Sequence, residues 1–418
     1  MQCLKIGWQS LFQHNLMSNF LHRRCPVCQA TNRKVLFRQE FASYSDGGLM
    51  PGYDVTVCSA CGAGYADDIP SQAEFDRYYA QMSKYEHAYR DGKVSDVDAA
   101  RFAEVVDLAG PHVKSGDRIV DVGCATGALL AEFKRRGFTN LQGYDPSRVC
   151  CEAGKRLYGI DVAESTINGL TSHSESADLV IMTGVLEHLA DVDTSLHLLR
   201  GLLASGGMLY LEVPDASRYD EWFSAPYQFF SMEHVNFFSP QSLSNLLTRH
   251  GFSPVFVCRV KRFIGAQSVE PGIAGLFKLN PDSEEMVVDI ETSPRLRSYI
   301  DESAKLEATI RQKIATLSDS QASLAVWGVG THTLRLLETS ELKNANIVAF
   351  LDSNSRYHGK TLHGITIEDP SKFMRPEVSI LISSHMAQED IKDSIVNKLG
   401  LKNPVVCLYE GAPVDVLS

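Results

Sequence analysis

The 418-residue sequence lacks the features of a membrane or secreted protein. No apolar run approaches the roughly 20 residues that a transmembrane helix needs. The first sixteen residues contain Lys5 as their only lysine or arginine and no sustained apolar stretch, so a secretory signal peptide is not expected. Met17 is an alternative start, which leaves open whether residues 1–16 belong to the native protein. We therefore expect a cytoplasmic protein without a membrane partner.

Positive charge is also scarce. The chain has 40 lysines and arginines against 51 aspartates and glutamates, a formal net charge of −11. This balance disfavours a general nucleic-acid-binding role, because phosphate binding needs clustered basic residues. A local basic stretch over residues 23–38, which includes Arg23, Arg24 and Arg33, keeps RNA binding open as a less favoured alternative. No internal repeat of solenoid length and no low-complexity tract is present.

Ten cysteines are present, and their pattern suggests a metal site. Without export the compartment is reducing, and paired cysteines are then more often metal ligands than disulfides. The stretches "CPVC" and "CSACG" each point two thiolates at one ion, and together they complete a tetrahedral shell. A closed four-thiolate shell leaves no open coordination position, so we expect a structural zinc ion without catalytic function. Its ligands would be Cys25, Cys28, Cys58 and Cys61.

The rest of the chain shows two stretches of alternating strand and helix patterns. Short apolar runs alternate with amphipathic helical patterns between about residues 96 and 255, which is typical of a parallel sheet covered by helices. The alternation restarts with "SLAVWGVG" and "ANIVAFLD", after a segment with helical spacing of its apolar residues. We expect a zinc-binding module at 17–88, an α/β domain at 89–255, a helical connector at 256–322 and a second α/β domain at 323–418.

The stretch "RIVDVGCATGALL" reads as a strand, a glycine loop and a helix. Asp121 ends the strand, and Gly123 and Gly127 frame the turn. The next strand, "LQGYD", ends in Asp145, which is placed to accept both ribose hydroxyls of an adenosine. The central loop positions begin with Cys124 and lack the glycine pattern that a dinucleotide's pyrophosphate requires. A nucleoside without a phosphate at the loop is therefore favoured.

"DVGCATG" resembles the first motif of class I methyltransferases, which bind S-adenosylmethionine. The resemblance continues through "SADLVIMTGVLEHLADVDTSLHLLRGLLASGGMLYLEVPD" and covers about 100 residues in all. It implies that Asp121 serves the ammonium group of the cofactor, that Asp145 binds its ribose and that the adenine lies near Glu164. The residues expected to contact the cofactor are Asp121, Gly123, Cys124, Gly127, Asp145, Glu164, Glu187 and His188.

The order of the modules resembles a family of three-domain sugar methyltransferases, some of which C-methylate nucleotide-linked keto-sugars. "SMEHVNFFS" matches a Glu–His segment of that family, which implies catalytic roles for Glu233 and His234. An imidazole suits removal of the acceptor's proton, because its pKa lies near neutrality. Ser231 replaces a tyrosine of the family, and "KRFIGAQS" replaces a glycine-rich turn, so C- and O-methylation both stay open. A plain turn pair without catalytic function is the alternative for Glu233 and His234.

Two further sets of residues follow from the same resemblance. Tyr78, Tyr79 and Tyr85 lie between the zinc module and the core, where the resemblance implies that aromatic residues border the active site. We take Tyr79 as catalytic, with packing at a domain boundary as the alternative. In the last domain the resemblance implies that Gly328, Gly330 and Asp352 bind the nucleotide of the substrate.

Departures in the last domain keep other interpretations open. Thr333 stands at the third fingerprint position, and "THT" replaces the lysine of the family, so a degenerate and empty site is the alternative. Weak dinucleotide binding is also open.

The sequence therefore predicts an α/β protein. It would have a Rossmann-like class I methyltransferase core, a small N-terminal zinc-binding module and a second, C-terminal Rossmann-like domain. The predicted function is S-adenosylmethionine-dependent methylation of a sugar, nucleotide-linked, in glycan or natural-product biosynthesis. An RNA methyltransferase and a catalytically inactive nucleotide-binding or assembly protein are the alternatives. The sequence does not determine the sugar or the oligomeric state.

Overall fold

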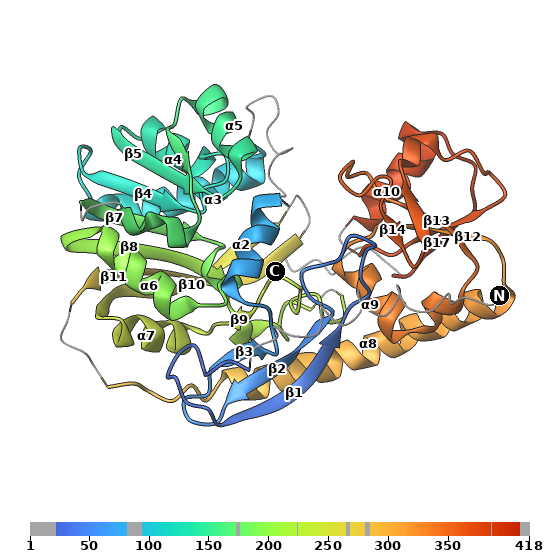
Figure 1. The fold of residues 1–418 in the computed structure, drawn as a ribbon, viewed down its shortest axis with the longest axis horizontal. Coiled ribbons are helices and arrows are strands. Elements are labelled where there is room, and N and C mark those ends of the chain that lie inside the picture. The colour runs from blue at the N-terminus through green and yellow to red at the C-terminus, as the bar shows by residue number, and fades with distance from the viewer. Residues whose placement is uncertain are drawn as a thin grey trace, which may run out of the picture.

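The computed structural model describes residues 22–81, 94–172, 176–223, 225–264, 268–280, 285–385 and 387–409. Three β-sheets organise this part of the chain, with four, seven and six strands. In Figure 1 the seven-stranded and six-stranded sheets form separate lobes, and the long helix α8 (Thr292–Ser320) runs along the lower edge between them. Within these ranges, no helix combines the length and apolar content needed to cross a membrane.

The four-stranded sheet is antiparallel, and its last strand comes from far along the chain. Phe237 lies opposite Gly64, and Asn236 lies opposite Tyr65. The cysteine-bearing module is therefore fastened to the segment that carries Glu233 and His234. In sheet order the strands are β1 (Arg33–Glu40), β2 (Gly52–Cys58), β3 (Gly64–Asp67) and β9 (Asn236–Phe237).

The seven-stranded sheet has a parallel part and an antiparallel hairpin at one edge. Five strands pair in parallel, in the order β6 (Val162–Glu164), β5 (Asn140–Asp145), β4 (Arg118–Val122), β7 (Ala177–Thr183) and β8 (Leu203–Pro214). The hairpin of β11 (Ser268–Leu279) and β10 (Phe252–Ile264) extends the sheet beyond β8. Residues 256–264 and 268–279 were expected in a helical connector and are instead strands, because their apolar residues face the same cores as those of β8.

Helices cover both faces of this sheet. Buried residues of α3 (Asp96–Ala109) and α4 (Ala128–Arg135) pack on one face, and those of α6 (Val192–Leu202) and α7 (Pro240–Arg249) pack on the other. Helix α5 (Arg148–Tyr158) follows β5. The helix starts are encoded locally, because the side chains of Ser95, Ser147, Asp191 and Ser239 each accept a backbone N–H of the first turn. Each such cap stabilises its helix by about 1 kcal/mol.

The six-stranded sheet is the second α/β unit predicted from the sequence. Strands β13 and β16 pair in parallel with β12, one on each side of it. The order of the strands in the sheet therefore reverses at β12, although their direction does not. Helix α9 (Thr331–Thr339) follows β12, and α10 (Gln388–Asp393) follows β16. The strand order is β14 (Thr361–Leu362), β15 (Ile365–Glu368), β13 (Ile347–Leu351), β12 (Leu324–Trp327), β16 (Ser379–Ile382) and β17 (Val405–Cys407).

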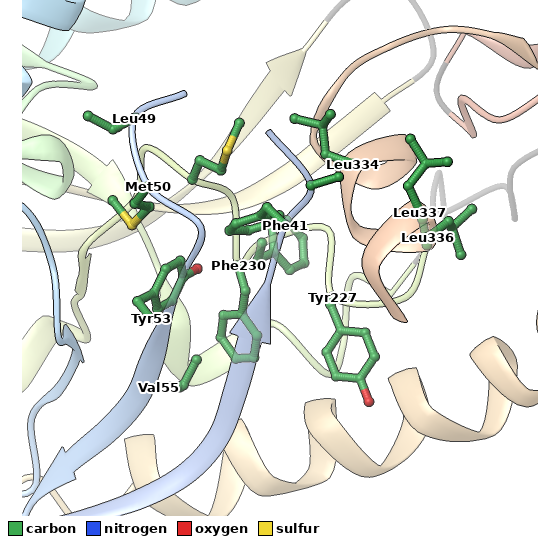
Figure 2. Packing of buried hydrophobic residues seen from close by; sticks show 14 of the residues in the cluster. Phe41, Leu49, Met50, Tyr53, Val55, Tyr227, Phe230, Leu334, Leu336 and Leu337 are labelled. Carbon is green, nitrogen blue, oxygen red and sulfur yellow. The ribbon is translucent and has the colours of Figure 1, made fainter. Parts of the chain in front are cut away.

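The modules share one hydrophobic core. Figure 2 shows Tyr53 and Val55 of the four-stranded sheet, Tyr227 and Phe230 of the intervening segment and Leu334 of α9 within the same cluster. Helix α8 contributes buried residues at helical spacing, as the sequence predicts. Helix α2 (Gln72–Gln81) also packs here, through its tyrosines. The N-terminal module and the C-terminal lobe therefore share this cluster, and the C-terminal lobe buries a second cluster of its own.

A buried ion pair joins the modules at the centre of this core. The guanidinium of Arg335 binds both carboxylate oxygens of Glu307 on α8, at 2.9 Å each. It also donates to the Gln39 side chain of β1 and lies 4.1 Å from the ring centroid of Tyr227. Since both ionised side chains are almost fully buried, each depends on the other for its compensation.

Candidate functional site

The glycine loop after β4 is held in a conformation that few residues adopt. Gly123 has φ +78° and Gly127 has φ +73°, and Ala125 between them has φ +48°. A side chain at Gly123 would place its Cβ 2.5 Å from a methyl group of Val185. The first turn therefore requires glycine, whereas Ala125 adopts its left-handed conformation at the cost of local strain.

Asp145 closes this loop from the end of β5. Its Oδ2 accepts the N–H of Ala125 at 2.8 Å, and its Oδ1 accepts the N–H of Ser147 at 2.9 Å. Each carboxylate oxygen has a second lone pair, so the group can still accept two ribose hydroxyls. Burial raises the pKa of Asp145, and the two N–H donors oppose that shift. The residues present therefore fit an adenosine at this edge of the sheet.

Asp121 lies behind the loop, fully enclosed. Burial, together with the neighbouring Asp145, raises the pKa of its carboxyl group to about 8. A cation in the pocket would favour ionisation of Asp121, which matches the ammonium group expected beside it. Cys124 is buried under Gly143, and Glu164 ends β6 opposite Asp145 with its side chain exposed.

The structure brings the two Glu–His pairs of the sequence together. Glu187 and His188 lie in the short 3-10 helix η3 (Leu186–His188) after β7. The N–H of Val235 donates to the Glu187 carbonyl at 2.8 Å, and the Asn236 side chain donates to the carbonyls of Leu186 and Leu189. Strand β9 thereby fixes the segment that contains the second pair against η3.

The ring centroids of His188 and His234 lie 4.8 Å apart in a nearly perpendicular arrangement. The Tyr79 hydroxyl lies 2.9 Å from Nδ1 of His188. Tyr78 donates to Oε1 of Glu233 at 3.1 Å, and burial and the Glu233 carboxylate raise the pKa of this phenol. Ser231 accepts the N–H groups of Glu233 and His234 through its hydroxyl, which folds the pair into a turn.

A buried ionic cluster adjoins these pairs and was not expected from the sequence. Arg262 of β10 lies 3.5 Å from Glu187, 3.4 Å from Glu212 and 3.7 Å from Glu270. Burial raises the pKa of Glu270, and Arg262 opposes that shift. The cluster escaped sequence reasoning because its residues come from three strands and a turn that only the folded hairpin of β10 and β11 brings together.

The four predicted cysteine ligands meet in one place. The Sγ atoms of Cys25 and Cys61 are 3.6 Å apart, and those of Cys28 and Cys58 are 3.5 Å apart. Tetrahedral zinc with Zn–S bonds of about 2.3 Å separates its sulfurs by about 3.8 Å, so the cluster fits such an ion. Gly62, with φ +82°, makes the tight turn after the second pair.

A second cavity of about 410 Å³ opens at the carboxyl ends of β12, β13 and β16. The crevice where strand order reverses is the usual ligand site of such sheets. Gly328, Gly330 and Asp352, which were predicted from the sequence, all line it. His332, Ser383, Ser384 and His385 also line it, and their strand-end positions are the signal that could have identified them.

Segment 225–228 forms one wall of this cavity and precedes the second Glu–His pair by a few residues. Burial lowers the pKa of His332 to about 3, and its Nε2 lies 2.6 Å from the Tyr409 hydroxyl. His332 is therefore neutral in the fold.

Known proteins match both α/β units. Residues 94–256 match the family model described as a methyltransferase domain. Residues 320–406 match the family model described as C2185-like, N-terminal. A C-methyltransferase of Streptomyces niveus, NovU, is 24% identical over 315 residues, an alignment of 69% of this chain and 72% of that protein. The chain is an S-adenosylmethionine-dependent methyltransferase.

Other matches to this methyltransferase are partial. A ubiquinone biosynthesis O-methyltransferase of Chelativorans is 30% identical over 124 residues, which is 28% of this chain and 47% of that protein. A Burkholderia thailandensis 1,6-didemethyltoxoflavin-N1-methyltransferase structure, solved with S-adenosylhomocysteine, has 16% identity and a TM-score of 0.40. It covers 53% of this chain and 96% of that chain.

The predicted residues of this methyltransferase fall into four groups in the structure. The loop and strand-end residues lie around the turn after β4, and the Glu–His residues and Tyr79 form one cluster. The cysteines form a third group, and the C-terminal residues line the cavity at the ends of β12, β13 and β16. Glu164 is the outermost of the first group, and Tyr85 lies outside the described residues. Asn236 and Arg262 are additions that the tertiary structure makes.

Proposed function

We propose that the protein transfers a methyl group to a carbon or oxygen atom of a nucleotide-linked sugar in glycan or natural-product biosynthesis. The observation that carries the proposal is the convergence of two Glu–His pairs, with histidine ring centroids 4.8 Å apart, at the end of β7 beside the glycine loop. The alignment of a named C-methyltransferase with 69% of this chain supports transfer to carbon. The shorter O-methyltransferase alignments keep oxygen as the second candidate acceptor.

The Glu233–His234 pair is the proton acceptor in this proposal. Methylation of a hydroxyl, or of a carbon beside a carbonyl, requires a base within hydrogen-bond reach of the acceptor. Tyr78 orients the Glu233 side chain, and the turn at Ser231 orients His234. Tyr79, bonded to His188, completes the polar edge of the cluster. Buried aromatic residues on both sides of the pair, Phe230 and Phe237, limit access of water.

The crevice around Asp145 would hold the cofactor. When bound, S-adenosylmethionine supplies the activated methyl group. Asp145 would accept the ribose hydroxyls, Asp121 would face the ammonium group, and the main chain around Gly123 would lie against the methionyl part. Glu164, at the exposed end of β6, would lie near the adenine. Gly127 allows α4 to start directly behind the loop.

The second cavity supports a nucleotide-linked acceptor. Three of its walls are the strand ends that bind nucleotides in such sheets, with Gly328, Gly330 and Asp352 among them. Tyrosines lie beside this cavity: Tyr44 donates to the Val329 carbonyl at 2.5 Å and stacks on Tyr357. A substrate with a nucleotide at one end and a sugar at the other fits this arrangement.

The N-terminal module has a structural role in the proposal. Cys25, Cys28, Cys58 and Cys61 would hold zinc, and β3 of the same module carries β9. Two of its basic residues are engaged within the fold, since Arg33 pairs with Asp67 at 2.6 Å and Arg23 donates to the Val235 carbonyl at 3.1 Å. This engagement favours a small-molecule substrate over RNA.

A mass-spectrometric screen of sugar nucleotides with S-adenosylmethionine tests the proposal, and one product should gain a methylene mass. His234→Ala should abolish this turnover and leave cofactor affinity near wild type, because the imidazole lies with the acceptor and not with the adenosine. Unchanged turnover in His234→Ala would remove His234 from the mechanism. Absence of calorimetric binding of S-adenosylmethionine to the wild type would instead favour an inactive assembly protein.

A further inference from the structure

Glu187, His188 and His234 form a cluster with the composition of a metal site. One carboxylate oxygen and one nitrogen from each ring lie within 4.8 Å of one another. Two imidazoles and a carboxylate on one side of an ion leave its other positions open, and this ligand set suits first-row transition metals. We propose that these three residues bind a divalent transition-metal ion at the point where the methyl acceptor lies. The inference rests on the proposed function for the identity of that acceptor.

The hydrogen bonds of His188 occupy Nδ1 and leave Nε2 available to bind a metal ion. We assign the proton of His188 to Nδ1, because this atom lies 3.0 Å from the carbonyl oxygen of Glu233, which can only accept, and 2.9 Å from the Tyr79 hydroxyl, which can accept as well. In the neutral ring Nε2 is then the atom with the lone pair, and it lies 4.0 Å from Oε1 of Glu187. Metal-bound histidines characteristically donate their other N–H to a backbone carbonyl or carboxylate, which fixes the tautomer and the ring orientation.

Glu187 has a buried carboxylate, and its two oxygens accept fewer hydrogen bonds than they could. The residue is 1% exposed, and its Oε2 has no hydrogen-bond partner within the part of the chain that the structure describes. Its Oε1 meets Arg262 only at 3.5 Å. An ionised carboxylate removed from water is stabilised by a cation or by strong donors. The two half-buried histidines that face it supply the remaining ligands and keep one side open.

The surrounding charge favours a cation. Glu212 and Glu270 lie around Arg262 together with Glu187, and the guanidinium groups facing these three carboxylates are those of Arg262 and Arg101. Carboxylates therefore outnumber guanidiniums among these described residues. A divalent ion restores the balance, whereas an anion would add to the excess.

The three ligand atoms lie somewhat farther apart than they would around a bound metal ion. Ligand atoms bound at about 2.1 Å are separated by about 3.0–3.5 Å in tetrahedral or octahedral sites. Binding would draw the three ligand atoms together from their present separations of up to 4.8 Å. The main chain is already fixed by the bond from Val235 to Glu187.

An ion at this position would change the division of labour within the proposed reaction. It would hold the hydroxyl or carbonyl oxygen of the sugar and acidify the proton that must leave. That O–H or C–H bond breaks, and its proton passes to the Glu233 carboxylate. The electron pair left on the acceptor atom forms the new bond to the methyl carbon, and the pair of the broken S–C bond stays on sulfur. His234 then acts as a ligand and Glu233 as the base.

Mn²⁺ is the probe that separates this site from the cysteine cluster, because Mn²⁺ prefers nitrogen and oxygen ligands to thiolates. The full chain, with its cysteine site undisturbed, is titrated with Mn²⁺ and free ion is measured by electron paramagnetic resonance. One bound ion is expected for the wild type, with at least about tenfold weaker binding in Glu187→Gln and His234→Gln. His250→Gln is the matched control, because His250 pairs with Asp193 away from the cluster and should bind Mn²⁺ as the wild type does.

No Mn²⁺ or Co²⁺ binding beyond the cysteine site, or equal binding in Glu187→Gln and the wild type, would overturn the metal inference. Methyl transfer that persists after exhaustive chelation would overturn it as well and leave the proposed function intact. Mn²⁺ binding without methylation of any sugar nucleotide would confirm the ion and contradict the acceptor. Circular dichroism of each variant ensures that lost binding is not lost folding.

Discussion

The two α/β units of the molecule use the same local design in different surroundings. In the first unit Gly123 donates to Tyr144 at 2.8 Å, and in the second Gly328 donates to Leu351 at 2.8 Å. Asp145 and Asp352 then repeat one pattern: Oδ2 accepts an N–H of the glycine loop, and Oδ1 accepts the N–H two residues further along the chain. Strand, loop and acid are thus equivalent in both units.

The surroundings of the two loops differ. The first loop opens toward the Glu–His cluster at η3, whereas the second opens toward segment 225–228 and the side chain of Gln39. Five residues after the helix N-cap, α4 has Glu132 in surface ion pairs and α9 has Arg335 in a buried one. The comparison teaches that the local motif fixes the geometry of the glycine loop and its acid, and that the neighbouring modules decide which side chains face that loop.

Replacing Arg335 of α9 and Glu132 of α4, which occupy equivalent helix positions, should give the largest difference in unfolding free energy between the two units. Arg335→Met removes one partner of a buried ion pair and leaves Glu307 uncompensated, which should cost about 3–5 kcal/mol of unfolding free energy. Glu132→Ala removes an exposed pair and should cost less than about 1 kcal/mol. Urea denaturation measures both. Arg311→Met, which removes the more exposed partner of the same Glu307, is the control, and an equal loss there would contradict the assigned role of Arg335.

The two acids should separate the ligands of the two units. Asp145→Asn should weaken S-adenosylmethionine binding about 10–100-fold, because charge-assisted hydrogen bonds contribute about 1.5–3 kcal/mol. Asp352→Asn should leave that affinity within about twofold and raise the KM for the sugar nucleotide. Calorimetry and steady-state kinetics provide the measurements. Equal weakening of cofactor binding in both variants would show that the two crevices are not independent.

The loop glycines should respond unequally to alanine. Gly123→Ala combines a positive φ with a contact to Val185, and should cost about 1–2 kcal/mol or more. Gly330 has φ −72° and no atom within 4 Å of an added Cβ. Gly330→Ala should stay within about 0.5 kcal/mol of the wild type, since lost capping and reduced unfolded-state entropy offset each other. Thermal unfolding distinguishes the two, and a large loss for Gly330→Ala would contradict the open geometry.

The pH dependence of stability should have opposite signs in the two units. The pKa of His332 is lowered to about 3 in the fold, so on acidification the unfolded chain takes up this proton at a higher pH than the folded chain does. Stability therefore falls as pH drops from about 6.5 toward 3. Asp121, with its pKa raised to about 8, keeps its proton longer in the fold, so stability falls as pH rises from about 4 toward 8. Each slope is at most about 1.4 kcal/mol per pH unit.

His332→Gln should flatten the acidic limb and Asp121→Asn the neutral limb in urea midpoints measured from pH 4 to 8. A variant that shifts all midpoints equally, without changing a slope, would show that the group does not titrate in this range.

Strands and loops with strong local signals were predictable. The residue ranges of β4, β5, β12 and β13 follow from apolar runs that end in glycine or aspartate. The hairpin of β10 and β11 was not, because Lys261, Arg262 and Glu270 interrupt its apolar pattern, and Arg262 and Glu270 compensate each other only across the two strands. Its long-range pairing with β8 leaves no signature in the local sequence.

The sequence by itself determined the cysteine quartet, the two glycine loops, their acids and the two Glu–His pairs, because each depends on residues that are close along the chain. Only the tertiary structure decided that the pairs meet, that β9 joins the cysteine module to η3 and that Arg262 and Arg335 are buried. These features depend on contacts between residues far apart in the sequence. Their stability comes from the shared core, which no single segment encodes.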